Sequence, residues 1–417
     1  MKQYPMMETR AGKFAFGVFL FVMLLLARDT LITSCLVGFT KGQVLMAGLI
    51  VLAGLVFLGK YRREWKQILT DGRIVLMIVS AAVLLIPMAV KGDWTLMYLS
   101  ILLCLLFAVF LTYFTTWQEV AKYYVVILTG LSLYSLVAMY VLKGQANSGS
   151  IAPSVFVNSA GENFYNFGLA YVVPNPYWRR NFGIFREPGV YQFFLILGLY
   201  LNHYGVQWKC QGWMWLVSAV LAVTMLSTFA IGGFIEMGLF ALFLFFDRKL
   251  YRSIWGKLAA GAILAACLGA VAFILIRIHT TVFEDTIIYE FYDMFLRLTT
   301  DSNSLVDRLS AIFTSAGSFF RHPVAGDTVA NVLHGTEHNT SSTLILYAVL
   351  GFAGGSLNVA AWIALAWKRE RCVFGNLVLL VILFMSFNTQ NLVADVFFWL
   401  FPYMALTQSL LPRMKKL

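Results

Sequence analysis

The chain has 417 residues, of which 60% are hydrophobic and only 12% are charged. A soluble domain could not bury so many apolar side chains, so the composition excludes a soluble protein and indicates an all-α polytopic membrane protein. The formal net charge of +11 is concentrated in short loops on one side, so it reports membrane topology and indicates no nucleic-acid partner.

Twelve apolar segments are candidates for membrane-spanning helices, since a bilayer core about 30 Å thick is crossed by roughly 20 apolar residues. They are 14–37, 42–59, 74–90, 95–115, 121–142, 188–206, 213–231, 233–246, 257–277, 342–367, 373–388 and 396–412. Segments 233–246 and 373–388 are the shortest. The N-terminal segment, 14–37, is too long for a signal peptide and no A-x-A cleavage site follows it, so we expect it to remain as a helix.

Basic residues in the short loops set the expected orientation. With both termini in the cytoplasm, the inner loops contain most of the Lys and Arg residues, including the clusters at 60–66 and 248–257, as the positive-inside rule requires. The five cysteines lie in or at the edges of the apolar segments and form no C-x-x-C pair. We therefore expect neither a disulfide framework nor a cysteine metal site.

Two outer loops are long, 143–187 and 278–341, and the whole of 1–417 is expected to form a single membrane domain. In the second loop, apolar residues recur at helical spacing over 283–299 and 305–320. Each stretch is expected to form an amphipathic helix at the outer interface. Such helices could have only a structural role, covering the outer end of the helix bundle, or they could guide a substrate.

The segment RRNFGIFREPGVYQ, which begins at Arg179, ends the first outer loop. Its proline suits the first turn of the next helix, and Glu187 before it can interact with the positive end of that helix. Arg179, Arg180 and Arg186 could bind phosphate oxygens through their planar guanidinium groups. They could instead reach lipid headgroups or pair with Glu187.

Other polar and aromatic residues allow more than one interpretation. Near the end of the first segment, Arg28 and Asp29 are expected to pair with each other, and Glu236 needs a polar partner inside the bundle. Aromatic residues of the first outer loop could stack on sugars or form an interfacial belt. These are Phe164, Tyr165, Tyr171, Tyr177 and Trp178.

The segment HGTEHNTSS, residues 334–342, can be interpreted in two ways. HGTEH has the H-x-x-E-H spacing of one class of zinc peptidases, but a zinc site would need a helix through Gly335 and a third ligand with no obvious candidate. The following TSS is typical of a helix start, so HGTEH is expected to precede that helix and no metal is expected. His338 is then a group that can accept a proton from a hydroxyl at neutral pH.

Four segments resemble elements of the O-antigen polymerase and O-antigen ligase superfamily, the bacterial membrane glycosyltransferases that use polyprenyl-pyrophosphate-linked glycans. RNFGIFREPG (180–189) is similar to its Arg-x-x-Gly element and TMLSTFAIGG (224–233) to its Thr-x-Ser segment. DRLSAIFTSAGSFFRHPVAG (307–326) is similar to its Arg-Leu helix with Pro and Gly, and HNTSSTLILYAVLGFAGG (338–355) to its His-Asn and Gly-x-x-Gly element. In one departure, the family often has Gly-x-Gly after the proline, whereas here Gly326 is followed by Asp327 and Thr328.

The resemblance implies a GT-C-like, metal-independent glycosyltransferase without a cofactor in the bacterial plasma membrane. Its donor and acceptor would be polyprenyl-pyrophosphate-linked glycans, and its partners a flippase, a chain-length regulator and membrane lipids. Arg180 and His338 would be catalytic, the first stabilising the leaving pyrophosphate and the second taking the proton of the acceptor hydroxyl. The residues expected to bind pyrophosphate or glycan are Arg179, Arg186, Glu187, Arg308, Arg321 and Asn339.

The sequence REPG at 186–189 and the two sizeable outer loops resemble those of polymerases more than those of ligases. They favour a polymerase that joins repeat units into O-antigen, capsular polysaccharide or exopolysaccharide. One alternative is a ligase that transfers the glycan to a lipid core or a protein. From another class, the chain could be a lipid-linked oligosaccharide flippase. A transporter would be expected to show internal repeats, broken helices and midplane charges. The polar and ionisable residues of this chain are instead concentrated in the two outer loops, which favours the enzyme.

Overall fold

The structure is a computed structural model that describes residues 9–27, 29–33, 39–60, 71–157, 161, 163–174, 180–254, 256–258, 261, 302–333, 341–388 and 390–414. The described chain is mostly helical, so the expected helical class is confirmed. Eleven of the predicted apolar segments coincide with a helix, and the twelfth, 257–277, lies almost wholly outside the described residues. The helices are α1 (Arg10–Leu25), α2 (Phe39–Lys60), α4 (Gly72–Lys91), α5 (Leu96–Leu111), α6 (Trp117–Val137), α8 (Pro188–Tyr204), α9 (Gln211–Ser227), α10 (Ile231–Asp247), α15 (Ser342–Ala366), α16 (Val373–Asn388) and α17 (Val396–Met414).

Among the described residues, three helical stretches are long and apolar enough to cross a membrane, namely Gly72–Lys91, Trp117–Asn147 and Ser342–Ala366. The second of these is α6 continued by η4 (Ala138–Leu142) and α7 (Lys143–Asn147), so this helix runs past its predicted end. The chain is therefore compatible with a membrane protein. Several of the other apolar helices are shorter.

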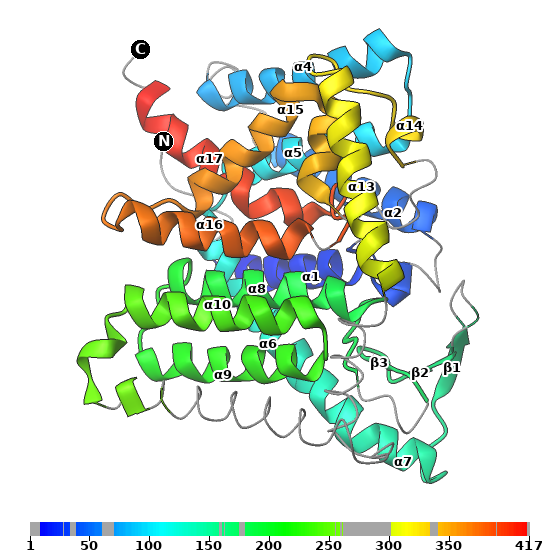
Figure 1. Cartoon of the computed structure of the whole chain (residues 1–417), viewed down its shortest axis with the longest axis vertical. Helices are drawn as coiled ribbons and strands as arrows, with labels where there is room; N and C mark the ends of the chain where they lie inside the picture. Colours follow the sequence, from blue (N-terminus) through cyan, green and yellow to red (C-terminus); the bar gives the residue numbers. More distant parts are fainter. Residues whose placement is uncertain are drawn as a thin grey trace.

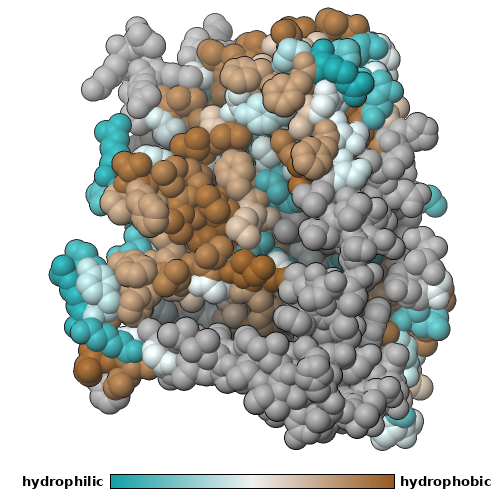
Figure 2. All heavy atoms as spheres, in the orientation of Figure 1, coloured by the Kyte–Doolittle hydropathy of each residue, from teal (hydrophilic) through white to brown (hydrophobic). Residues whose placement is uncertain are grey.

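The helices pack around α8, which is buried along almost its whole length. It contacts α6, α9, α10 and α16, and Figure 1 draws α8, α9, α10 and α16 side by side in one direction. A helix that is apolar on every side is expected to be buried in this way. Figure 2 shows apolar residues gathered over the part of the face where α15 and α16 lie, and hydrophilic residues at its left edge.

The first helix ends earlier than predicted. α1 ends at Leu25, whereas the apolar pattern extends to residue 37. Asp29 has a left-handed backbone with φ of 63°, and the Thr30 and Thr33 hydroxyls donate to the carbonyls of Leu25 and Ala27 at 2.8 and 3.2 Å. These hydrogen bonds satisfy the last carbonyls of the helix and turn the chain away.

A small sheet within residues 143–187 corrects the all-α expectation. It contains β1 (Ser154–Val157), β2 (Asn163–Asn166) and β3 (Tyr171–Val172), all antiparallel in that order, with Phe156 opposite Phe164. Phe164 and Tyr171 are buried with Leu31 and Phe182, so these two aromatic residues belong to a local core. Their apolar contacts hold the sheet against the chain that follows α1.

Within residues 278–341, the helix expected over 305–320 is confirmed as α13 (Ser302–Arg321), and the short α14 (Val329–Leu333) follows it. The stretch 283–299 lies outside the described residues. α13 packs against α15, and Ala311, Ser315 and Ser318 on it are buried. Figure 1 draws α13 across the direction of α8 and α10.

Candidate functional site

The side chain of Asn181 holds the segment 180–187 against two helices. Its amide nitrogen donates to the hydroxyls of Ser135 on α6 and Ser227 at the end of α9, each at 3.0 Å. Its amide oxygen accepts the N–H of Gly183 at 2.9 Å. Because Asn181 is only 2% exposed, this buried network fixes the backbone path of the segment.

Gly183 is the glycine of the Arg-x-x-Gly element, and the structure gives two reasons for a glycine here. Its φ is +56°, which strains a residue with a side chain, and a Cβ would lie 2.6 Å from the ring of Tyr191. The Tyr191 hydroxyl contacts the hydroxyls of Ser132 and Ser135 at 3.1 and 3.3 Å. The ring is therefore held from the α6 side and has little room to move.

Arg180 is half-buried and its Nε donates to the carbonyl of Thr228 at 3.4 Å. Thr228 directly follows α9, and the next residue, Phe229, has a φ of +47°, which turns the chain into α10. The structure thus places the segment 180–189 beside 224–233, although most of α8 and α9 lies between them in the sequence.

Arg186 pairs with Glu187 and with Asp29, which lies four residues after the end of α1. Nη2 of Arg186 lies 3.0 Å from Oε1 of Glu187 and 3.6 Å from Oδ1 of Asp29. Glu187 is the N-cap residue of α8, but its side chain makes no capping hydrogen bond. Pro188 occupies the first turn, as predicted. Asp29 thus has a partner in Arg186, whereas Arg28 lies outside the described residues.

The start of α15 is held by the end of α16. The helix begins at Ser342, so the start predicted from TSS is confirmed. Oδ1 of Asn388 accepts hydrogen bonds from the Ser341 hydroxyl at 3.1 Å and from the Thr343 N–H at 2.9 Å. This external side chain takes the place of a capping residue within α15, whose own Ser341 makes no cap hydrogen bond.

Gln390, in the connection between α16 and α17, joins the starts of α8 and α15. The Ser342 hydroxyl donates to its carbonyl at 2.7 Å, while its side-chain amide lies so close to Gly189 that a Cβ there would collide with it. The sequence analysis missed Asn388 and Gln390. Their signal was the polar run NTQN between two apolar segments.

The turn after α13 packs against a break in α15. Gly351 has φ of 66° and ψ of −167° inside the helix; a Cβ at Gly351 would collide with the Val324 carbonyl, and one at Gly326 with the Val349 carbonyl. Nζ of Lys91 contacts the Val349 carbonyl as well. Gly326 and Gly351 therefore allow the two backbones to approach each other closely, which explains why segments 307–326 and 338–355 each have a glycine at this contact.

Asp327, which directly follows Gly326, organises the turn after α13. Its carboxylate accepts hydrogen bonds from the Ser318 hydroxyl, the Thr328 N–H and the Asn331 amide, each at 2.8 Å. Desolvation raises the pKa of Asp327, but these hydrogen bonds outweigh it and leave the pKa below its usual value.

Glu236 on α10 is fully buried, and its polar neighbours are Gln192 of α8 and Ser386 of α16. Neither carboxylate oxygen makes a well-formed hydrogen bond to the described residues. The side chain of Gln192 also packs on Gly232 and Gly233. The polar partners that the sequence required for Glu236 thus come from two other helices.

The remaining predicted residues are only partly placed. Arg179, His338 and Asn339 lie outside the described residues, as does the pentapeptide HGTEH, and the same holds for the side chain of Arg308 on α13. Arg321 ends α13, is exposed, and donates from Nε to the Gly317 carbonyl of its own helix at 3.3 Å.

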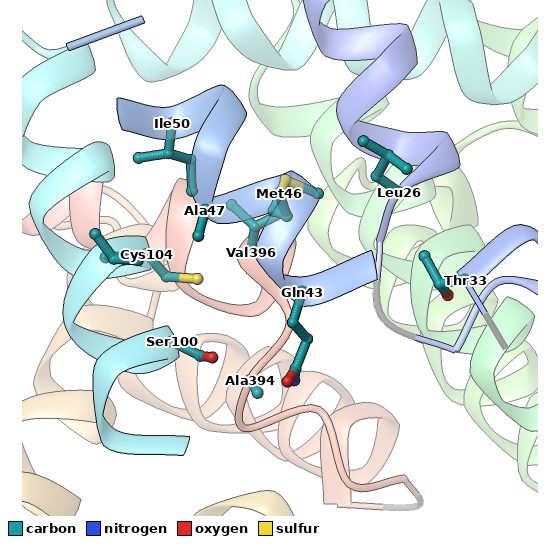
Figure 3. Close-up of a pocket in the computed structure, with 11 residues that line it drawn as sticks. Leu26, Thr33, Gln43, Met46, Ala47, Ile50, Ser100, Cys104, Ala394 and Val396 are labelled. Carbon is teal, nitrogen blue, oxygen red and sulfur yellow. The ribbon is translucent and has the colours of Figure 1, made fainter. Parts of the chain in front are cut away.

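A pocket lies among α1, α2, α5 and the start of α17, and Figure 3 shows its lining. Most lining residues are apolar, with Thr33, Gln43 and Ser100 as polar exceptions. Ala394 comes from the same connection as Gln390. None of the described candidate residues lines the pocket.

The four segments that carry the resemblance form one continuous set of contacts. Asn181 and Arg180 join 180–189 to 224–233, and the turn after α13 joins 307–326 to the described part of 338–355. Gln390 connects the two pairs. Comparisons with protein-family models, curated proteins and solved structures found no match to the chain.

Proposed function

We propose that the chain is a metal-independent membrane glycosyltransferase that polymerises polyprenyl-pyrophosphate-linked repeat units at the outer face of the bacterial plasma membrane. In this proposal it has about twelve spans in a GT-C-like arrangement, with both termini in the cytoplasm. The observation that supports it most is the contact of Gln390 with the start of α8 and the start of α15. Each helix directly follows one of the two long outer loops.

Arg180 is the residue that we propose to hold the pyrophosphate. Its backbone is fixed by the buried Asn181 network and its Nε by the Thr228 carbonyl. A cation preorganised in this way stabilises charge that develops on a leaving group without further rearrangement. Arg186 already lies beside two carboxylates, Asp29 and Glu187, so we assign it a supporting role.

His338 is the proposed general base, four residues before the start of α15. It takes the proton of the acceptor hydroxyl as that oxygen bonds to the anomeric carbon of the donor. The bond between the anomeric carbon and the pyrophosphate oxygen breaks, and the electron pair stays on the pyrophosphate. Arg179, Arg308, Arg321 and Asn339 would contact the pyrophosphate or the glycan. Guanidinium groups neutralise the leaving group, so the scheme needs no metal.

The test replaces Arg180 by Lys and His338 by Ala in cells that make the polysaccharide. Both variants should lose long-chain glycan while single repeat units still reach the outer face. Arg369→Lys is the matched control, because Arg369 is exposed in the connection between α15 and α16, away from the starts of α8 and α15. This substitution should leave the glycan unchanged.

Two outcomes would favour the alternatives. If single units disappear from the outer face as well, the chain is a flippase. If long lipid-linked chains persist in both variants but no longer reach a lipid core or a protein, the chain is a ligase.

A further inference from the structure

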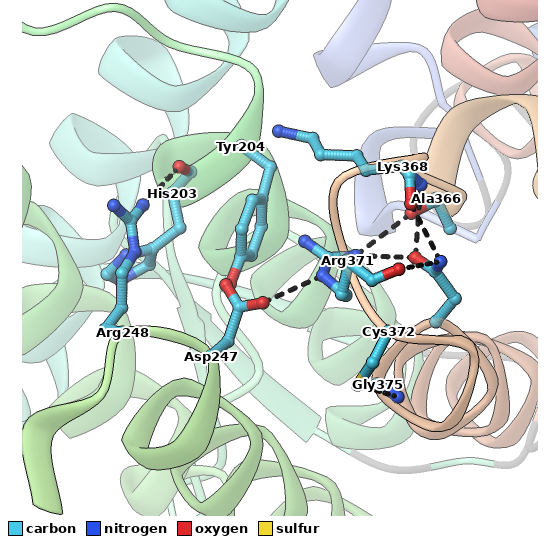
Figure 4. Close-up of polar contacts among 10 residues, drawn as sticks. His203, Tyr204, Asp247, Arg248, Ala366, Lys368, Arg371, Cys372 and Gly375 are labelled. Atoms are coloured by element: carbon cyan, nitrogen blue, oxygen red, sulfur yellow. Dashed lines mark hydrogen bonds and ion pairs between the residues drawn. The ribbon is translucent and has the colours of Figure 1, made fainter.

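Three cationic side chains surround the ring of Tyr204 at the end of α8 (Figure 4). Nζ of Lys368 lies 4.9 Å from the ring centroid, and Cζ of Arg371 and of Arg248 lie at 4.7 and 5.5 Å. They come from the connection between α15 and α16 and from the end of α10. All three therefore contact the same aromatic ring, and Figure 4 shows Arg248 and Arg371 on opposite sides of it.

The only carboxylate in this cluster that forms an ion pair, among the described residues, is Asp247. It accepts from Nε of Arg371 at 2.9 Å and from the Tyr204 hydroxyl at 2.6 Å. Arg371 also donates to the Ala366 carbonyl at 3.2 Å and is 6% exposed. The Asp247–Arg371 pair is thus a structural link between α10 and the α15–α16 connection, and its charges cancel.

Lys368 and Arg248 carry the charge that remains. Nη2 of Arg248 donates to the neutral carbonyl of His203 at 2.8 Å. Nζ of Lys368 lies over the Tyr204 ring and is attracted by the carboxylates of Asp247 and Glu370. Burial lowers the pKa of Lys368, and the nearby Arg371 and Arg248 lower it further. Both cations lie against the same ring and raise each other's electrostatic energy, so an anion within reach of both would stabilise them.

The surroundings of the cluster are apolar and exposed. Phe246 at the end of α10 is 59% exposed, Phe374 at the start of α16 is 76% exposed, and Trp367 beside Lys368 is 38% exposed. Aromatic residues next to basic ones are typical of the level of the lipid headgroups, with acyl chains beyond them. This chemistry matches an amphiphilic anion better than a soluble one.

We propose that Lys368 and Arg248 bind the phosphate of an anionic phospholipid at the end of the bundle opposite the candidate site. In the orientation of the positive-inside rule, this end faces the cytoplasmic leaflet, where basic pockets between helices bind anionic headgroups. Tyr204 and the Asp247–Arg371 pair hold the two cations in place. The site is independent of the glycosyltransferase function.

The experiment measures thermal unfolding of the purified full chain in detergent with added phosphatidylglycerol or phosphatidylcholine. Phosphatidylglycerol should raise the Tm of the wild type, and phosphatidylcholine should not. Lys368→Gln should weaken the apparent affinity for phosphatidylglycerol roughly tenfold, the loss expected for one charge-assisted contact with a phosphate. Lys368→Arg should keep the affinity.

Arg369→Gln is the matched control because it removes the same charge from the neighbouring exposed position, and its affinity should equal that of the wild type. If Lys368→Gln does not fold, Lys368→Met, which keeps the stem against the ring, replaces it. Equal stabilisation by both lipids, or equal loss in the Arg369 control, would overturn the proposal. If inorganic phosphate or pyrophosphate at the same concentration raises the Tm in a Lys368-dependent way, the site binds a soluble anion, and the proposal of a lipid is overturned.

Discussion

The side chain of Asn181 uses both of its amide hydrogens and its oxygen inside the protein. Nothing in the sequence marks it, because an asparagine between an arginine and a phenylalanine in a Gly- and Asn-rich loop is ordinary. Its role depends on Ser135 and Ser227, which come from helices on either side of it in the chain. Partners of this kind are set by tertiary packing, so the sequence could predict Arg180 as a candidate but not what positions it.

Asn181→Ala should destabilise the chain by about 2 kcal/mol, since it leaves buried groups without hydrogen bonds. Glycan synthesis should fall as well, because the backbone next to Arg180 loses its anchor. Thermal unfolding and glycan length on gels measure the two effects. Asn147→Ala, at an exposed position, is the control; an Asn181→Ala variant as stable and active as this control would contradict the assigned role.

The carboxylate of Asp327 predicts a dependence on pH. Its pKa in the folded chain lies below the usual value of 3.8 because three hydrogen bonds outweigh desolvation. The stabilisation is therefore present above that value and is lost as the pH falls through the lower pKa of the folded chain. The difference in Tm between wild type and Asp327→Asn should be largest near pH 5 and should shrink as the pH falls below about 3.8. A difference that stays constant over this range would show that the hydrogen bonds do not depend on the charge.

At the scale of elements, apolar length and start signals predicted the helices well. Pro188 and TSS marked the starts of α8 and α15 correctly, since such signals act within one turn of the helix. The pattern failed where hydrogen bonds override hydropathy, as at Thr30 and Thr33 after α1. It also missed the sheet, because strands of four residues or fewer with Phe164 in a local core give little periodic signal.

The break in α15 provides a prediction for an element. Gly351→Ala should strongly destabilise the contact between α13 and α15, because it combines a positive φ with a collision against the Val324 carbonyl. Gly317→Ala on α13 is the matched control: a Cβ there meets nothing within 4 Å, so it should be neutral or stabilise by up to about 1 kcal/mol. Thermal unfolding of both variants measures the difference. Equal Tm values would mean that the α15 break tolerates a side chain.

At the scale of the whole molecule, the two halves of the proposed site come from helices that are 154 positions apart at their starts, Pro188 and Ser342. The order of these motifs along the chain was part of the resemblance. Their contact through Gln390 could not be predicted from that order. A polar connection between the last two apolar segments could touch any neighbouring helix end. Only the packing of α16 against both α8 and α15 directs this connection to the site.

The contact of Gln390 with Gly189 can be tested by a double-mutant cycle. Gly189→Ala should lower glycan synthesis, because its Cβ forces the end of the Gln390 side chain to shift, while the position itself lies in α8 and suits alanine. In a Gln390→Ala background no such shift is needed, so the same substitution should have little further effect on glycan synthesis. Gly238→Ala on α10, where a Cβ meets nothing within 4 Å, is the control. If Gly189→Ala is equally harmful in both backgrounds, Gln390 does not join the two helix starts, and the proposed site loses the contact that holds its two halves together.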